Sequence, residues 1–406
     1  MNINPKILFS RKSYFYPDMS KNFQITQYEL PVSENGYLTF KHEGKEVRIR
    51  ITRIHIEEDP GKLVHKGGNI MKSEYTLIDY NRSGSPLLEI VTEPDLKTPK
   101  QARQFLQVLR NILEHLDVLL PNTFFKVDCN VSIEGSERVE IKNVTGARNV
   151  EKALTFEIRR LKSMKNMKVK FPQHTRHYDE KRGVTQLLRT KEIADDYGYI
   201  FEPDLPCYTI EKQAIETIRK EMPELPYQRI VRFVNEYKIP LKQCETIILT
   251  DKYLADLFED VAQQIKDYKA LSNFVLVQLL KILNYNKKRL SQTGINKNQI
   301  VELFTKLSKK EISMRLVKEL VKTQEFLNGE SIEQIIIKHE YQKLDDETTI
   351  VKRIQKVLEN NKKQVEEYKN GKTRVFNFLL GECLKALNYT VDVGIVRAEL
   401  EKLLKS

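Results

Sequence analysis

The 406-residue sequence is poor in cysteine and contains no long apolar run. Its four cysteines are scattered, with no Cys-x-x-Cys pair among them: Cys129, Cys207, Cys244 and Cys383. This spacing argues against a zinc ribbon and against a disulfide framework. Because no stretch approaches about 18 consecutive apolar residues, the sequence predicts no membrane span.

Standard nucleotide loops are also missing. No G-x-G-x-x-G fingerprint occurs, and Gly371-Lys372-Thr373 is preceded, five residues earlier, by Glu366 where a P-loop needs glycine. Any use of ATP must therefore rely on another kind of site. No Gly-Ser-rich nucleophile loop or Cys–His pairing stands out for amide hydrolysis either.

What the sequence does contain is typical of a soluble globular protein of two or three domains. Apolar residues make up 40%, charged residues 31% and aromatic residues 9%, which excludes disordered and collagen-like classes. The net charge of +12 favours an anionic partner. The windows 151–200 and 351–406 each hold 12 basic and 7 acidic residues, a pattern that suits contact with nucleic acid.

The hydrophobic period changes along the chain. Up to about residue 205 it is mostly that of strands, with two inserted helices, one of them starting at Thr98-Pro99 with a cap and a proline at its first position. Residues 125–133 and 139–141 predict a hairpin with one apolar and one charged face. From about residue 210 the pattern is helical. We therefore expect an α+β fold.

Two carboxylates lie where solvation is poor. Val47, Ile49 and Ile51 alternate, and then the phase slips to Ile54 and Ile56, which indicates a β-bulge. Past the bulge, Arg53, His55 and Glu57 share one face, whereas Glu58 falls on the face of Ile54 and Ile56. Glu89 similarly lies inside the apolar run 87–91. A carboxylate in such a place needs a partner or a metal.

Further polar residues extend this pattern into a candidate site. Carboxylates with a few basic groups suit Mg²⁺ bridging phosphate oxygens during phosphoryl transfer, and a solvated charged sheet face remains the alternative. The members are Glu57, Glu58, Glu89, Asp128, Glu140 and Asn130, with Lys62, Arg82 and Lys142.

Many short motifs in order resemble one family, the B subunit of the aminoacyl-tRNA amidotransferases (the GatB/GatE family). They cover nearly the whole chain: FSRKSYFYPD (9–18), QITQY (24–28), RIHIEEDPGK (53–62), LIDYNR (77–82), PLLEIVTEPD (86–95), DCNVS (128–132), VEIKN (139–143), EPDLP (202–206) and VEEYKNGKTRVFNFLLG (365–381).

The resemblance implies three domains. Residues 1–208 would form a cradle-shaped catalytic domain of mixed and antiparallel β-structure with helices, preceded in the family by a further segment with a Gly-Leu-Glu-x-His strand. Residues 209–294 would form a helical domain, and residues 295–406 an all-α, YqeY-like tail domain that binds tRNA.

The resemblance also implies a reaction. ATP, with Mg²⁺, phosphorylates the γ-carboxylate of Glu-tRNA(Gln), and ammonia then displaces phosphate to give Gln-tRNA(Gln). The partners would be an amidase A subunit, which supplies the ammonia, and a small C-type subunit. Glu58 and Glu89 match the family's magnesium ligands, and Lys12 matches a lysine of the ammonia channel. The remaining carboxylates, with Arg82, Lys62, Lys142 and Asn130, would serve catalysis and ATP binding.

For tRNA, the expected surface is the basic tail, with Lys362, Lys363, Lys369, Lys372 and Arg374. An alternative is a non-catalytic tRNA-binding or assembly subunit that has lost the metal site, because some family motifs are altered. A related archaeal-type subunit is less expected, since no inserted domain fits between Pro206 and Met222. The pI of about 9.2 and the Lys-, Asn- and Ile-rich composition favour the mitochondrial matrix, with the bacterial cytoplasm as the alternative.

Overall fold

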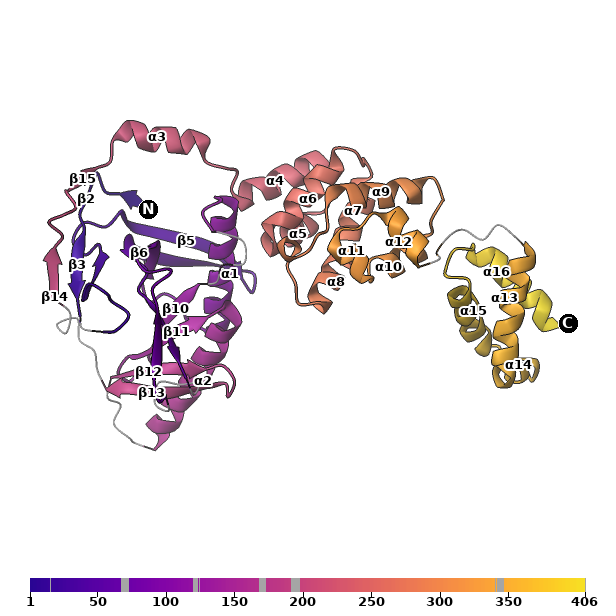
Figure 1. The fold of residues 1–406 in the computed structure, drawn as a ribbon, viewed down its shortest axis with the longest axis horizontal. Helices are drawn as coiled ribbons and strands as arrows, with labels where there is room; N and C mark the ends of the chain where they lie inside the picture. Colours follow the sequence, from indigo (N-terminus) through magenta and orange to yellow (C-terminus); the bar gives the residue numbers. More distant parts are fainter. Residues whose placement is uncertain are drawn as a thin grey trace. The chain divides into compact units, whose positions relative to one another are not determined.

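The computed structural model describes residues 1–14, 16–66, 73–119, 123, 125–167, 173–190, 198–339, 341 and 347–405. The chain groups into two compact units: Met1–Leu116 with Thr123–Pro223, and Glu224–Ser406 with the short segment Asp117–Asn122. Among the described residues every strand belongs to the first unit, and the second unit is helical (Figure 1). The predicted α+β class is therefore confirmed.

Two four-stranded sheets form the body of the first unit. One has the order β1-β5-β6-β9, with antiparallel neighbours: β1 (Asn2–Ile3), β5 (Ser33–His42), β6 (Lys45–Glu58) and β9 (Pro86–Thr92). The other has the order β10-β11-β12-β13, in which β11 and β12 run parallel: β10 (Lys126–Val131), β11 (Val139–Thr145), β12 (His174–Asp179) and β13 (Val184–Thr190).

Smaller sheets border these two. They are β14-β3-β4 (Gly198–Phe201, Ser10–Ser13, Phe23–Thr26), β15-β2 (Tyr208–Thr209, Lys6–Ile7) and β7-β8 (Lys62–His65, Thr76–Asp79). Helices α1 (Pro99–His115), α2 (Ala147–Asn166) and α3 (Lys212–Glu221) complete the unit.

Several local predictions are confirmed. The β6–β9 register shifts between Ile51 and Arg53, where the sequence indicated a bulge. Thr98 caps α1, its side-chain oxygen accepting a hydrogen bond from the Gln101 amide at 3.2 Å, and Pro99 is the first helical residue. Strands β10 and β11 pair as the predicted hairpin.

The two faces of the β10–β11 hairpin have different roles. Cys129, Val131 and Ile141 are buried in a hydrophobic core that also contains Phe105 of α1 and Leu161 of α2, and Figure 1 shows both helices beside this sheet. The alternate residues point to the opposite face: Asp128, Asn130, Glu140 and Lys142.

One charged side chain lies entirely inside the first unit. Glu157 of α2 is 0% exposed. Its carboxylate is 2.5 Å from Nη2 of Arg160 and 3.3 Å from Nε of Arg176, and it accepts a hydrogen bond from the Thr185 hydroxyl at 2.6 Å. The carboxylate therefore joins α2 to strands β12 and β13.

The second unit consists of helices, none of which, in the part of the chain that the structure describes, has both the length and the apolar character for crossing a bilayer. They are α4 (Pro226–Tyr237), α5 (Leu241–Thr250), α6 (Lys252–Ala262), α7 (Tyr268–Asn273), the π-helix η3 (Phe274–Leu279), α8 (Leu280–Tyr285), the 3-10 helix η4 (Leu290–Gln292), α9 (Lys297–Ser308), α10 (Met314–Leu320), α11 (Gln324–Asn328), α12 (Ile332–Lys338), α13 (Glu347–Asn360), α14 (Lys362–Lys369), α15 (Val375–Ala386) and α16 (Val393–Lys405).

These helices enclose two hydrophobic clusters. The first runs from Ile230 to Ile336, and the second from Ile350 to Leu404. Residues on both sides of position 294 pack in the first cluster. The predicted boundary at 294/295 therefore does not coincide with the break between the clusters, which falls after Ile336.

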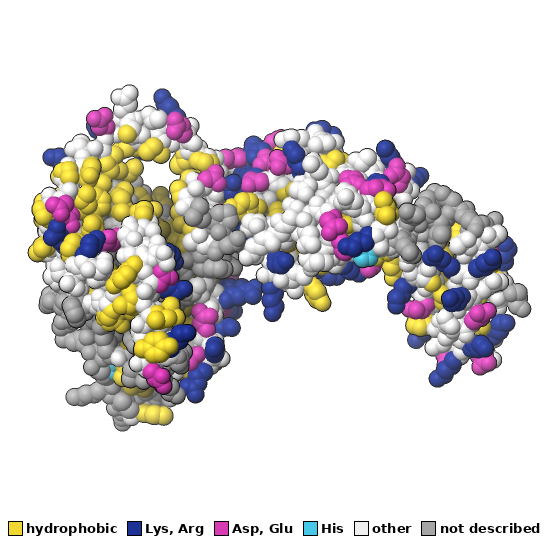
Figure 2. Space-filling view, viewed as in Figure 1, with side chains coloured by type: hydrophobic (Ala, Val, Ile, Leu, Met, Phe, Trp, Pro, Cys, Tyr) yellow, Lys and Arg dark blue, Asp and Glu magenta, His cyan; other side chains and the backbone are white. Residues whose placement is uncertain are grey.

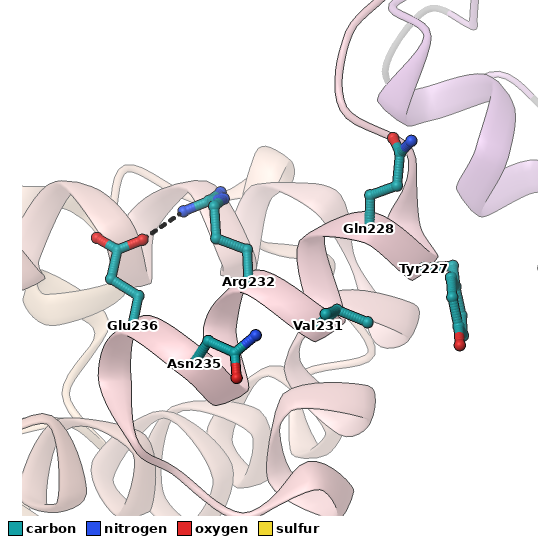
Figure 3. Close-up of a pocket in the computed structure, with 6 residues that line it drawn as sticks. All are labelled: Tyr227, Gln228, Val231, Arg232, Asn235 and Glu236. Carbon is teal, nitrogen blue, oxygen red and sulfur yellow. Dashed lines mark hydrogen bonds and ion pairs between the residues drawn. The ribbon is translucent and has the colours of Figure 1, made fainter.

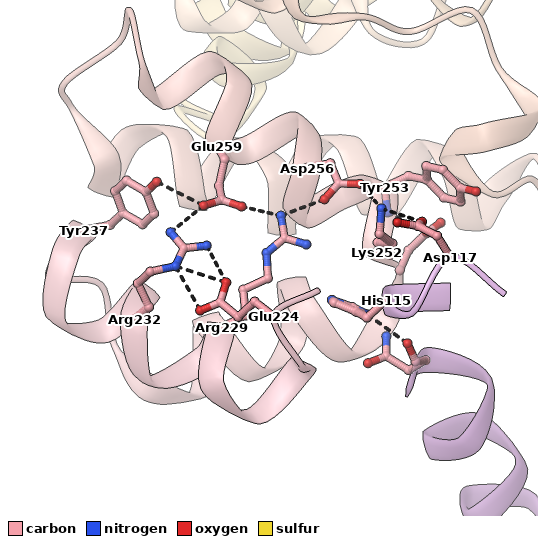
Figure 4. Close-up of polar contacts among 12 residues, drawn as sticks. His115, Asp117, Glu224, Arg229, Arg232, Tyr237, Lys252, Tyr253, Asp256 and Glu259 are labelled. Atoms are coloured by element: carbon pink, nitrogen blue, oxygen red, sulfur yellow. Dashed lines mark hydrogen bonds and ion pairs between the residues drawn. The ribbon is translucent and has the colours of Figure 1, made fainter. Parts of the chain in front are cut away.

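An ion-pair network fixes the start of the second unit (Figure 4). The side chain of Arg229 on α4 is 7% exposed and contacts Glu259 and, at 2.7 Å, Asp256, both on α6. Arg232 contacts Glu224 at 2.8 Å and Glu259 at 2.5 Å. The network therefore joins α4 to α6. Removing one of its partners would leave a buried charge uncompensated.

A close backbone contact gives a stability prediction. A Cβ at Gly294 would lie 2.1 Å from the Asn328 carbonyl oxygen, whereas one at Gly381, inside α15, would meet nothing within 4 Å. Gly294→Ala is expected to lower the free energy of unfolding by about 1–3 kcal/mol. The control Gly381→Ala should raise it by about 0.5–1 kcal/mol. Urea unfolding measures both, and equal values for the two variants would contradict the contact.

Candidate functional site

Three side chains of the first unit meet in a carboxylate–imidazole cluster. His55 and Glu57 alternate along β6, and the register places Glu89 of β9 opposite His55. His55 Nε2 lies 3.4 Å from Glu89 Oε2 and 4.0 Å from Glu57 Oε2. One ligand atom from each residue falls within 4.8 Å of the others. We call these three residues the metal-site cluster.

The electrostatics of this cluster favour a bound cation. Burial and the charge of Glu89 raise the pKa of Glu57 to about 7, while the hydrogen bond with His55 lowers the pKa of Glu89. The side chain of His55 is 4% exposed, and its Nδ1 atom is buried without a hydrogen-bond partner among the described residues. Two carboxylates and an imidazole fit a divalent cation, the carboxylates suiting Mg²⁺ or Mn²⁺.

Glu58 lies elsewhere. Its carboxylate accepts hydrogen bonds from Lys21 Nζ at 2.7 and 2.8 Å and from the Ile25 amide at 2.9 Å. In the described structure, the glutamate beside Glu89 is therefore Glu57 and not the predicted Glu58. The sequence showed correctly that Glu58 needs a partner, but not that Lys21, 37 positions away, supplies it.

Two glutamines of the QITQY motif hold the end of β6. Gln27 accepts a hydrogen bond from the Ile56 amide at 2.9 Å, and Gln24 donates one to the Glu58 carbonyl at 2.8 Å. Pairing with β5 ends at Ile54. The side chains of β4 and of the residues just after it thus replace a neighbouring strand along the segment that carries Glu57.

Lys12 lies close enough to affect this cluster. Its charge lowers the pKa values of Glu57 and Glu89, although less than burial and His55 change them. Lys12 of β3 pairs with Tyr199 of β14, whose ring stacks on Tyr28 with 4.3 Å between centroids. Burial raises the pKa of Tyr199. An aromatic pair and a cation therefore border the carboxylates.

A second polar group lies on the charged face of β10 and β11. Lys142 Nζ is 3.0 Å from Glu140 and 3.3 Å from Asp128, and Asp128 also accepts a hydrogen bond from the Asn143 amide at 2.8 Å. Burial acts to lower the pKa of Lys142, but the two carboxylates outweigh it and the pKa is raised. Asn130 is exposed opposite Glu140.

Strands β7 and β8 bring a third pair of predicted residues together. Lys62 and Arg82 line a cavity of about 220 Å³ with Asp79. Backbone and side-chain hydrogen bonds from Asn81 lower the pKa of Asp79. Arg82 Nη2 is also 3.6 Å from Asp59. Two cations beside a cavity suit a phosphate group.

The five predicted tail residues are all exposed, on α14 and in the turn that follows it. Among them Lys372 forms an ion pair with Glu367 at 3.6 Å. In Figure 2 the helices from α13 onward show many Lys and Arg side chains and fewer acidic ones.

A separate hollow of about 690 Å³ lies along α4 in the second unit (Figure 3). It is lined by Tyr227, Gln228, Val231, Arg232, Asn235 and Glu236. Tyr227 is 77% exposed, and Arg232 is held by Glu236 at 3.1 Å. The lining holds one carboxylate, so it lacks the converging acidic groups of the metal-site cluster.

The metal-site cluster has a measurable consequence for stability. In the folded chain Glu57 keeps its proton up to about pH 7 instead of its ordinary 4.5. Without divalent cations, the stability of the first unit should therefore fall by about 1–3 kcal/mol as the pH rises from 4.5 to 7. Glu57→Gln should remove this dependence. Urea unfolding in EDTA at both pH values measures it, and an unchanged slope in the variant would contradict the assignment.

An α+β unit that holds a carboxylate–imidazole cluster is thus joined in one chain to a helical unit. Residues 1–216 match the family described as the GatB/GatE catalytic domain, and residues 256–404 match the GatB domain. The chain belongs to this family.

Relatives at about 40% identity support the same assignment. The chain is similar to the B subunit of the aspartyl/glutamyl-tRNA(Asn/Gln) amidotransferase of Sulfolobus acidocaldarius, at 42% identity over 98% of the chain and 85% of the relative. It is 43% identical to the protein of that name from Saccharolobus solfataricus over 98% of the chain and 85% of the relative. The protein of that name from Thermodesulfovibrio yellowstonii is 37% identical, over 99% and 85%.

Proposed function

We propose that this chain carries the phosphorylation and amidation steps of a tRNA-dependent amidotransferase. The observation that carries the proposal is the metal-site cluster of His55, Glu57 and Glu89 within the region that matches the GatB/GatE catalytic domain. The substrate is the glutamate of Glu-tRNA(Gln), and the product is Gln-tRNA(Gln).

The reaction has two steps with balanced bonds. The γ-carboxylate of the tRNA-bound glutamate attacks the γ-phosphorus of ATP, and ADP leaves. Ammonia then attacks the acyl phosphate, inorganic phosphate leaves, and the amide remains. A divalent cation bound by the metal-site cluster would neutralise negative charge on the phosphate oxygens.

Four basic residues of the first unit would bind ATP or border the path of the ammonia. Lys62 and Arg82, beside their cavity, bind phosphate oxygens of ATP. Lys142 is held by Asp128 and Glu140 and offers a positive charge on the sheet face opposite the core, where Asn130 is exposed. Lys12, whose charge acts on Glu57 and Glu89, borders the path by which ammonia arrives.

The partners follow from the same proposal. Membership of this family implies a complex of several chains, and we propose an amidase A subunit as the source of ammonia and a small C-type subunit as the third member. The exposed tail cations contact the tRNA backbone. The mitochondrial location remains a prediction. The compared relatives come from archaea and bacteria, which is compatible with the alternative of the bacterial cytoplasm.

The test is an assay of the purified complex with Glu-tRNA(Gln), ATP, Mg²⁺ and ammonium chloride, which bypasses the glutaminase. We expect Gln-tRNA(Gln) to form with one ADP released per product. Binding of Glu-tRNA(Gln) without any ATP-dependent product would instead support a non-catalytic tRNA-binding or assembly subunit.

A further inference from the structure

We propose that the outer face of α2 is a second contact surface for the phosphate backbone of RNA. Four cations on this helix, which we call the basic row, are exposed: Arg148, Lys152, Arg159 and Lys162. Their spacings of four, seven and three residues place them on one side of the helix. The row extends over about 21 Å at 1.5 Å per residue.

The basic row faces away from the protein core. The buried residues of α2, among them Val150, Ala153 and Leu161, lie on the opposite side of the helix and pack against the β10–β13 sheet and α1. Figure 2, viewed as Figure 1, shows Lys and Arg atoms along the side of the first unit formed by α1 and α2. The row is therefore open to a large ligand.

The charge of the row is uncompensated within the described structure. The two acids of α2 are occupied by other residues, because Glu151 pairs with Arg103 at 3.0 Å and Glu157 is buried with Arg160 and Arg176. Among the described residues, no member of the basic row forms an ion pair or a side-chain hydrogen bond. Neighbouring like charges on a helix repel one another, so an anion that binds the row relieves this repulsion.

The chemistry of this face favours RNA over other anionic partners. Thr155 lies between the cations in the sequence, and Ser163, next to Lys162, is exposed. The apolar residues Val150, Ala153 and Leu161 are buried on the other side of the helix. The row itself therefore offers cations and hydroxyls and not the apolar side chains that anchor a helix in a lipid surface or form the core of a protein interface. A linear row of cations suits a linear polyanion, whose binding releases counterions.

The row is a separate surface from the charged face of β10 and β11. It lies on the far side of α2 from the sheet, whereas Asp128 and Lys142 are on the sheet face opposite the core. That the RNA is an aminoacyl-tRNA rests on the proposed function, but the row as a surface goes beyond it.

The experiment measures binding of tRNA(Gln) to the purified complex over a range of salt concentrations. The variant carries Arg148→Gln, Lys152→Gln, Arg159→Gln and Lys162→Gln, which keep helix propensity. We expect its affinity to fall by at least about tenfold near 0.1 M salt. The slope of log K against log salt should decrease by about 3, at roughly 0.7–0.9 per phosphate contact.

The controls separate charge from folding and from chemistry. Exchanging Arg for Lys and Lys for Arg at the same four positions keeps the charge and should keep the slope. There are two half-variants, Arg148→Gln with Lys152→Gln and Arg159→Gln with Lys162→Gln. Each should show about half of the decrease in slope that is expected for the fourfold variant. The probe is tRNA(Gln) that carries no amino acid. Its binding can therefore be measured and interpreted even if the proposed amidotransferase reaction is wrong. An unchanged slope and affinity in the fourfold variant would overturn the proposal.

Discussion

Replacing Glu57 by glutamine is expected to reduce the rate of Gln-tRNA(Gln) formation by about a hundredfold or more. Glu57 lies in the metal-site cluster with His55 and Glu89, and stabilisation of transition-state charge by a bound cation is worth several kcal/mol. The amide keeps the size of the side chain and removes its charge. The measurement is single-turnover product formation with saturating ATP and Glu-tRNA(Gln).

The neighbouring residue is the matched control. Glu58→Gln removes the negative charge that pairs with Lys21, whose side chain is 42% exposed. We therefore expect a loss of stability of about 1 kcal/mol and a rate within about tenfold of wild type. The reverse order, with Glu58→Gln the more damaging change, would favour the ligand pair that the motif resemblance implies and would contradict the geometry described above.

Removing the buried carboxylate of Glu157 is expected to have the largest effect on stability. Glu157→Gln leaves Arg160 and Arg176 without their anionic partner inside the first unit, and breaking a buried pair in this way costs about 3–5 kcal/mol. Glu151→Gln on the same helix is the control, because the Glu151–Arg103 pair is partly exposed. That change should cost less than about 1 kcal/mol.

Denaturant unfolding of the two variants measures both losses of stability. A loss below about 1 kcal/mol for Glu157→Gln would mean that Arg160 and Arg176 find solvent or other partners in the variant. In that event the link between α2 and strands β12 and β13 would depend on apolar packing alone.

Local features could be predicted because they depend on neighbours in the sequence. The cap at Thr98 and the proline after it define the start of α1. Alternation over 125–133 and 139–141 identified the β10–β11 hairpin and its buried face. The phase slip after Ile51 located the bulge in β6. Each of these depends on backbone geometry within a few residues.

The partners of the polar residues could not be predicted in the same way. Lys21 reaches Glu58, Lys12 acts on Glu57, and Lys62 meets Arg82 at one cavity, each through the tertiary fold. The alternation of His55 with Glu57 and the place of Glu89 inside the apolar run 87–91 were visible in the sequence, but the pairing of β6 with β9 that brings them together was not. The parallel pairing of β11 with β12 likewise needs the crossover through α2.

The central claim is that His55, Glu57 and Glu89 bind the divalent cation that serves phosphoryl transfer. The most direct measurement is titration of the purified complex with Mn²⁺, followed by electron paramagnetic resonance, for wild type, Glu57→Gln and Glu58→Gln. We predict one site in wild type that Glu58→Gln keeps and Glu57→Gln weakens by at least about tenfold. Wild-type Mn²⁺ affinity in Glu57→Gln would contradict the claim.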